Sequence, residues 1–107
     1  MAIIVFDYDG VLTNVSVRWL AKKMIAERND VWIVTKRNDK MCDKDMEKVL
    51  EFIKLPKAKI VFTSNKKKIE FLTALNADMF IDDKTDEFFD ILNSTNTIPL
   101  CFKEDYL

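Results

Sequence analysis

Short, continuously apolar segments alternate along this chain with longer segments in which apolar residues recur every three or four positions. The short segments are rich in Ile, Val and Phe, which is typical of strands covered on both faces. Four of them predict strands, at residues 3–6, 31–34, 60–62 and 79–81. A fifth strand is predicted at 98–102. Pro99 places it at an edge of the sheet, because proline cannot donate a hydrogen bond to a neighbouring strand.

The segments between these strands carry apolar stripes at helical spacing, which predict four amphipathic helices. The stripes are Val17, Leu20, Ala21, Met24 and Ile25; Met46, Val49, Leu50 and Ile53; Ile69, Leu72 and Leu75; and Phe88, Ile91 and Leu92. We expect Ser16 to cap the first helix and Asn76 to end the third. Asp86 and Glu87 are expected in the first turn of the fourth, where the helix dipole favours acids.

This alternation of strands and helices predicts an α/β fold of the three-layer, Rossmann-like kind. We expect about five parallel strands with helices on both faces, and one domain over residues 1–107. Crossovers between parallel strands are nearly always right-handed, so the carboxyl ends of the strands meet at one edge of the sheet. Ligands of such sheets bind at that edge. The residues that follow each strand are therefore the candidates for chemistry.

Composition limits that chemistry. Apolar residues are 49% of the chain and charged residues 33%, as in ordinary globular domains. The 17 basic and 18 acidic residues nearly balance, so no global positive field points to a nucleic-acid partner, although a local patch is compatible with the sequence. The chain has no histidine, which excludes Ser-His triads and leaves acid–base chemistry to other side chains.

The two cysteines, Cys42 and Cys101, lie far apart and form no CxxC pair. This argues against a zinc site or a disulfide framework and favours a reducing compartment, the cytoplasm. The first residues lack a basic segment and their apolar run is short, so neither a signal peptide nor a membrane span is expected. Trp19, Trp32 and Met46 are expected in the core.

Polar residues that suit a phosphoryl site follow four of the predicted strands. They are Asp7 and Asp9; Thr35, Lys36 and Arg37; Lys66, Lys67 and Lys68; and Asp82 and Asp83. Close carboxylates repel one another unless a cation lies between them, and Mg²⁺ prefers oxygen ligands. Gly10, the only glycine, directly follows the first acids and indicates a turn that requires glycine. Each feature alone also fits a surface turn, a helix cap or a solvated lysine run. Together they predict a site for a divalent cation and a phosphoryl group.

Four segments, in order, resemble the motifs of the haloacid dehalogenase (HAD) superfamily. Residues 7–12, Asp-Tyr-Asp-Gly-Val-Leu, resemble its first motif, DxDGxL, and Thr35 at a strand end resembles the second. A lysine near a helix start resembles the third, and residues 80–83, Phe-Ile-Asp-Asp, the fourth. The resemblance covers residues 3 to about 102, and the first motif is its most specific part.

The resemblance implies a Mg²⁺-dependent phosphomonoester hydrolase that works through an aspartyl-phosphate. Asp7 would be the nucleophile, which splits hydrolysis into two steps. Asp9 would protonate the leaving oxygen and then activate water; an Asp at this position is typical of the family's phosphatases. Asp82 and Asp83 would complete the Mg²⁺ site. The other metal ligands would be Asp7 and the carbonyl of Asp9.

The same resemblance assigns Thr35 and one lysine to the phosphoryl oxygens, since phosphoryl transfer depends on positioning and charge stabilisation. Apolar residues at +3, +4 and +7 favour Lys68, with Lys66 as the alternative. Arg37 and Lys36 are candidates to grip a second phosphate or the leaving group, or they form a solvated basic loop.

Two short stretches bear on the substrate. Residues 35–37, Thr-Lys-Arg, resemble a form found in nucleotide phosphatases and polynucleotide 3′-phosphatases, and residues 81–85, Ile-Asp-Asp-Lys-Thr, resemble a stretch of the latter. A nucleotide or a nucleic-acid 3′-phosphate end is therefore a candidate substrate. The chain leaves no room for the cap domain usual in this family, at 10–35 or at 63–66. A large substrate or a second subunit of a homo-oligomer is expected to cover the open site.

Three other functions fit parts of the pattern. A signalling receiver domain shares the fold class, but its usual order of acids, phosphoacceptor Asp, Thr and Lys differs from the order here, and the third strand ends in Thr63 instead of the acceptor Asp. A binding or regulatory module would keep the fold without turnover. A phosphotransferase would pass the phosphoryl group to an alcohol instead of water.

Overall fold

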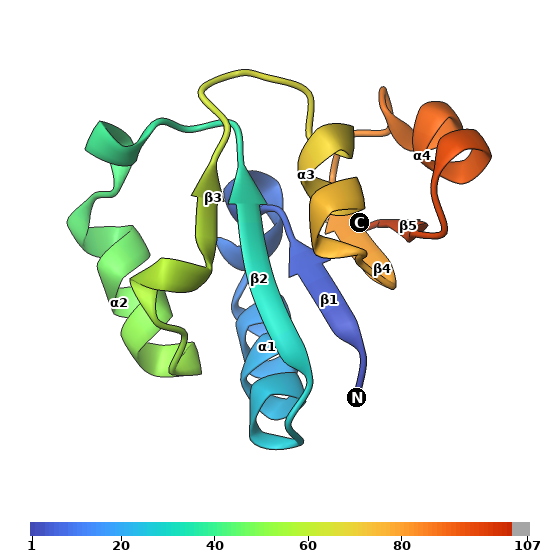
Figure 1. Ribbon diagram of the computed structural model, residues 1–107. Helices are drawn as coiled ribbons and strands as arrows, with labels where there is room; N and C mark the ends of the chain where they lie inside the picture. The colour runs from blue at the N-terminus through green and yellow to red at the C-terminus, as the bar shows by residue number, and fades with distance from the viewer. Residues whose placement is uncertain (104–107) are drawn as a thin grey trace.

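The sheet has five parallel strands in the order β3-β2-β1-β4-β5 (Figure 1). In this computed structural model, which describes residues 1–103, they are β1 (Ile3–Phe6), β2 (Asp30–Thr35), β3 (Ile60–Phe62), β4 (Met79–Asp82) and β5 (Ile98–Cys101). The predicted parallel α/β sheet is confirmed. Strand β5 lies at an edge, as Pro99 predicted.

Four helices cover the sheet, two on each face (Figure 1). They are α1 (Val15–Ala26) and α2 (Lys44–Ile53) on one face, and α3 (Ile69–Leu75) and α4 (Phe88–Ser94) on the other. Short turns lie at Tyr8–Leu12, Asp39–Met41 and Lys57–Lys59. The arrangement is the expected three-layer, Rossmann-like one.

Alternation along β1 divides the core into two parts, because successive side chains of a strand point to opposite faces. Ile4 and Phe6 pack against the buried residues of α1 and α2. Val5 packs on the opposite face, with Leu72 of α3 and Ile91 of α4. Phe6 and Val5 are completely buried. Burying side chains of this kind contributes roughly 2 kcal/mol each, so the central strand is anchored from both sides.

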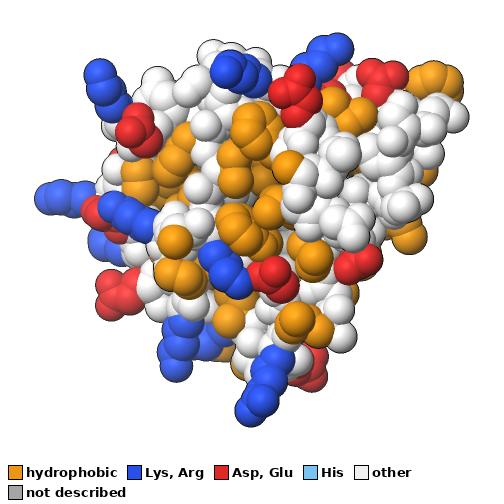
Figure 2. All heavy atoms as spheres, in the orientation of Figure 1, with side chains coloured by type: hydrophobic (Ala, Val, Ile, Leu, Met, Phe, Trp, Pro, Cys, Tyr) orange, Lys and Arg blue, Asp and Glu red, His pale blue; other side chains and the backbone are white. Residues whose placement is uncertain are grey.

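The face bearing α3 is less completely covered than the other. Figure 2 shows apolar side chains open in the middle of this face, in front of β2. Trp32 of β2 and Val61 of β3 are half-buried there, at the margin of the smaller core. The predicted core position is therefore only partly realised for Trp32, whereas Met46 is fully buried as predicted.

Several local predictions are wrong. Asn14, not Ser16, caps α1: its side-chain oxygen accepts hydrogen bonds from the backbone N–H groups of Ser16 and Val17. Its extended backbone lets the short amide reach the first turn. Trp19 and Leu92, expected inside, are 58% and 62% exposed. Both lie on helix surfaces that face away from the sheet.

The prediction for the end of α3 is confirmed, whereas the prediction for the first turn of α4 is wrong. Asn76 ends α3 in the left-handed conformation (φ 54°), as predicted. Asp86 and Glu87 do not lie in the first turn of α4, which begins at Phe88. The acid in that turn is Asp90.

Among the described residues, no helix is long and apolar enough to cross a membrane.

Candidate functional site

Asp7 and Asp82 face each other because the strands before them run side by side. Val5 of β1 pairs with Phe80 of β4, and both point toward the α3 face. Two positions further along each strand, Asp7 and Asp82 must point to that face as well. The N–H of Asp7 donates to the carbonyl of Ile81 at 2.9 Å, which continues the pairing of the strands to the site.

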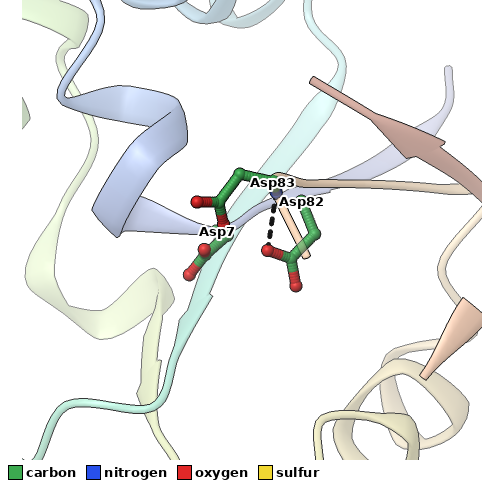
Figure 3. Close-up of side chains that lie close together, drawn as sticks. All are labelled: Asp7, Asp82 and Asp83. Atoms are coloured by element: carbon green, nitrogen blue, oxygen red, sulfur yellow. Dashed lines mark hydrogen bonds between the residues drawn. The ribbon is translucent and has the colours of Figure 1, made fainter. Parts of the chain in front are cut away.

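A third carboxylate, that of Asp83, completes the cluster (Figure 3). One oxygen from each of Asp7, Asp82 and Asp83 lies within 4.8 Å of the other two. Asp7 and Asp82 are each only 6% exposed. One oxygen of Asp82 accepts hydrogen bonds from the backbone N–H groups of Asp83 (2.7 Å) and Lys84 (3.2 Å). The turn after β4 thus fixes the orientation of that carboxylate.

Lys68 is the cation of this cluster. Its Nζ lies 2.9 Å from Asp7 Oδ1 and 3.1 Å from Asp82 Oδ2, and the residue is 3% exposed. The sequence left open whether Lys68 or Lys66 serves the site; the structure brings Lys68 to the acids and leaves Lys66 exposed. Burial of one ammonium between two carboxylates is stable only because each charge has a partner.

The carboxylate of Glu87 anchors the backbone of Lys68. One of its oxygens accepts hydrogen bonds from the backbone N–H groups of Lys68 (2.9 Å) and Ile69 (3.2 Å), at the start of α3. A carboxylate there satisfies two N–H groups that the helix itself cannot and complements the helix dipole. Its other oxygen lies 3.9 Å from Lys36 Nζ. The side chain of Glu87 therefore caps the start of α3, although in the chain Glu87 directly precedes α4.

The carboxyl groups of the cluster differ in proton affinity. Burial, reinforced by the charge of Asp82 and opposed by Lys68, raises the pKa of Asp7. Burial is also the largest influence on Asp82 and acts in the same direction, but the charge of Lys68, together with the hydrogen bonds that Asp82 makes, holds the pKa of Asp82 below its usual value. For Asp83, burial and then the neighbouring Asp82 raise the pKa.

Gly10 makes the approach of Asp83 possible. Its φ is +79°, in the left-handed region, and a β-carbon there would lie 2.2 Å from Asp83 Oδ2. The positive φ and the lack of space for a β-carbon both confirm the expectation that the turn after Asp7 requires glycine.

A cavity of about 290 Å³ opens over the cluster. Besides the three acids and Lys68, it is lined by Lys36 and Lys84, among others. Lys84, which the sequence argument did not single out, is exposed and directly follows Asp83. Asp86 and Glu87 also line it, so the cavity brings carboxylates and ammonium groups together, as a site for a cation and a phosphoryl group requires.

Asp9 also lines this cavity, but its carboxylate is engaged elsewhere. Arg37 Nε and Nη2 donate to its two oxygens at 2.9 and 2.7 Å, a bidentate ion pair. Arg37 Nη1 donates further to the carbonyl of Met41 (2.8 Å) and approaches Asp43 (3.4 Å). Asp9 is not part of the three-carboxylate cluster, so any role in metal binding falls to its backbone carbonyl.

Thr35 lies beside the cavity and is not among its described lining residues. It is 1% exposed, and its hydroxyl oxygen accepts a hydrogen bond from the backbone N–H of Arg37 at 3.3 Å. In this structure Thr35 shapes the turn that carries Arg37. Direct contact between Thr35 and a phosphoryl group stays a prediction.

The donor set fits a divalent cation. Three carboxylates converge on one point, and hard cations such as Mg²⁺ take oxygen ligands of this kind. Asp7, Asp82 and Asp83 are the residues that would hold it, with the carbonyl of Asp9 as the fourth protein ligand expected from the sequence.

Neither a family model nor a curated protein matches this chain significantly.

Proposed function

We propose that this protein is a Mg²⁺-dependent phosphomonoester hydrolase of the HAD superfamily, of a minimal type without a cap domain. The observation that carries the proposal is the cluster of the buried Asp7 and Asp82 with the half-buried Asp83, in which the ammonium of Lys68 pairs with Asp7 and Asp82. Mg²⁺ bound by these acids would neutralise the phosphoryl oxygens and the charge of the nucleophile.

In the first step, an oxygen of Asp7 attacks phosphorus, the ester P–O bond breaks, and Asp9 gives its proton to the leaving oxygen. In the second, Asp9 takes a proton from water and the resulting hydroxide attacks phosphorus. The bond between Asp7 and phosphorus breaks, which releases inorganic phosphate and restores both carboxyl groups. Lys68 stabilises the charge on the phosphoryl oxygens.

For this role Asp9 has to leave its ion pair with Arg37 and turn into the cavity that it already lines. Arg37, released from Asp9, and Lys36 at the rim would then bind a second phosphate or the leaving group. A nucleotide or a nucleic-acid 3′-phosphate end is the substrate we propose. A second subunit covering the open site, and a cytoplasmic location consistent with the two free cysteines, complete the proposal.

Phosphate release from 4-nitrophenyl phosphate, with Mg²⁺ and with excess EDTA, tests the proposal. We expect EDTA to abolish release and Asp7→Asn to lower kcat at least about a hundredfold. Acid quenching of the parent during turnover should trap a phosphoryl group on Asp7, detected by mass. Release that is unchanged in Asp7→Asn would reject the mechanism.

A binding module without turnover is the second candidate. The engagement of Asp9 by Arg37 favours it, because this ion pair keeps the expected acid–base group away from the cluster. Binding of Mg²⁺ and inorganic phosphate with no hydrolysis of any phosphomonoester would support the module and exclude the enzyme.

A further inference from the structure

A second and larger cavity shares no described lining residue with the acidic one but is linked to it by the ion pair of Arg37 with Asp9. It has a volume of about 570 Å³ and lies between α1 and α2. Its principal walls are three aromatic rings and three cations: Tyr8, Trp19, Phe52, Arg18, Arg37 and Lys48. Cavities of this size bind small molecules, and of its described lining residues only Arg37 takes part in the chemistry proposed at Asp7.

The aromatic side chains present ring surface at the rim of this cavity. Trp19 of α1 and Phe52 of α2 are in edge-to-face contact, with centroids 4.9 Å apart and planes at 87°. Trp19 is nevertheless 58% exposed, which is unusual for the largest apolar side chain. Lys22 lies over both rings, at 5.5 Å from the centroid of Trp19 and 4.3 Å from that of Phe52. This contact keeps a positive charge beside the ring surface.

The two cavities meet at the ion pair of Asp9 and Arg37. Asp9 lines the acidic cavity, whereas Arg37 lines the aromatic one. Tyr8, between Asp7 and Asp9 in the chain, has its ring under the Arg37 guanidinium, 4.9 Å from the ring centroid. A ligand that occupies both cavities therefore passes Asp9 and Arg37, the residues proposed to act on its phosphate.

We propose that the aromatic cavity binds the base of a phosphorylated nucleoside whose phosphate lies at Asp7. This inference rests on the proposed phosphatase function and adds the part of the substrate that the acidic cavity does not contact. Stacking of a base on an aromatic ring needs an exposed ring face, which Trp19 provides. Arg37 pairs with Asp9 and Asp43, and Arg18 donates to the carbonyls of Leu12 and Thr13. Lys48 and Asp45, which also line the cavity, supply a donor and an acceptor for the polar edge of a base.

The first test compares kcat/KM for a nucleoside monophosphate and for glycerol phosphate, which has no base. Stacking on one aromatic ring is worth about 5- to 150-fold in affinity. We therefore expect Trp19→Ala to lower the ratio of the two values at least about fivefold. Phe89→Ala, which removes an even more exposed aromatic ring (76%) from α4, should leave the ratio unchanged. A ratio that is the same in parent and Trp19→Ala would overturn the inference.

The second test needs no turnover. Trp32→Phe leaves Trp19 as the only tryptophan, and we expect adenosine, but not ribose, to quench its fluorescence. Quenching by adenosine without any phosphate release would uphold the base site and reject the phosphatase. Phosphate release without quenching would do the reverse.

The nucleoside can come from a free nucleotide or from the end of a strand. The aromatic cavity shares Lys48 and Phe52 with a hollow that is also lined by Lys22, Lys54 and an acid, Glu51. Its three lysines are the groups that would meet the further phosphates of a strand. An oligonucleotide with a terminal phosphate that is preferred over the mononucleotide, with a preference that falls as salt rises, identifies the strand end. Equal rates identify the free nucleotide.

Discussion

Gly10 and Asp83 fit together so closely that the carboxylate of Asp83 occupies the space where any other residue at position 10 would carry its β-carbon. Gly10 lies in the turn after β1, and Asp83 lies in the turn after β4. Their contact therefore sets how closely Asp83 approaches Asp7 in the carboxylate cluster.

We expect Gly10→Ala to destabilise the protein by about 1–3 kcal/mol, through the clash with Asp83 and the positive φ. It should also weaken Mg²⁺ binding, because Asp83 has to move. Denaturant unfolding and Mg²⁺ titration calorimetry measure the two effects. In a protein that already carries Asp83→Ala, the cost of Gly10→Ala should fall to the strain of the positive φ alone, about 1 kcal/mol. An equal cost in both backgrounds would show that the contact is not responsible.

Replacement of Lys68 tests the charge balance of the cluster. Lys68→Met keeps a long, unbranched side chain but leaves Asp7 and Asp82 without their cation. In the absence of metal, we expect this to lower the free energy of unfolding by about 3–5 kcal/mol. Mg²⁺ should restore more stability to this variant than to the parent, because it supplies the missing positive charge. Thermal unfolding with Mg²⁺ and with EDTA measures this difference.

Lys66→Met is the matched control for Lys68→Met, since Lys66 is exposed in the same segment of the chain. We expect a change within about 0.5 kcal/mol and no effect on phosphate release. Similar behaviour of the two variants would contradict the assignment of Lys68.

Glu87 should affect activity through the position of Lys68. Glu87→Ala removes the acceptor for two N–H groups at the start of α3, which costs about 1 kcal/mol. Glu87→Gln retains an acceptor oxygen and should cost less than half as much. Asp90→Ala, at an exposed acid of α4, serves as the control. If Glu87 positions Lys68, kcat should follow the same order as stability and recover in Glu87→Gln.

The pair of Asp30 and Lys59 predicts a dependence of stability on pH. A hydrogen bond from Lys59 is the main cause that lowers the pKa of Asp30 below its usual value of 3.8. The carboxylate therefore contributes stability above about pH 4, and this contribution is lost as the pH falls through the lower pKa of the folded state. Both side chains are partly exposed, so the contribution is below about 1 kcal/mol.

Asp30→Asn should accordingly be less stable than the parent at pH 7, and the difference should shrink as the pH is lowered from 5 to 3. Urea unfolding at a series of pH values measures it. A difference that stays constant over this range would assign the effect to packing rather than to charge.

The strands and the convergence of Asp7 with Asp82 followed from the sequence, because buried parallel strands are continuously apolar and their carboxyl ends share an edge. Two features could not be predicted this way. Lys66 and Lys68 have similar local surroundings in the sequence, and only the path of the loop after β3 decides which one turns inward. Glu87 caps a helix that begins many residues before it, and such a contact leaves no local pattern.

Trp19 shows a further limit of the pattern. Its aromatic character predicted burial, but it does not lie on the apolar stripe of α1, and it packs against Phe52 at the edge of the core. Asn14 was missed as a cap for a different reason: several polar residues precede α1, and only the backbone conformation distinguishes them.

The cluster draws Asp7 from the first strand of the chain and Asp82 from the fourth, so no carboxylate site exists until β4 has docked against β1. A cation that binds there cannot assist early folding events, because its ligands meet only late in the search for long-range contacts. Under the proposed function, a cation bound there should instead slow unfolding while leaving the folding rate unchanged, so we expect the lifetime of the native state to be the property that responds most to it.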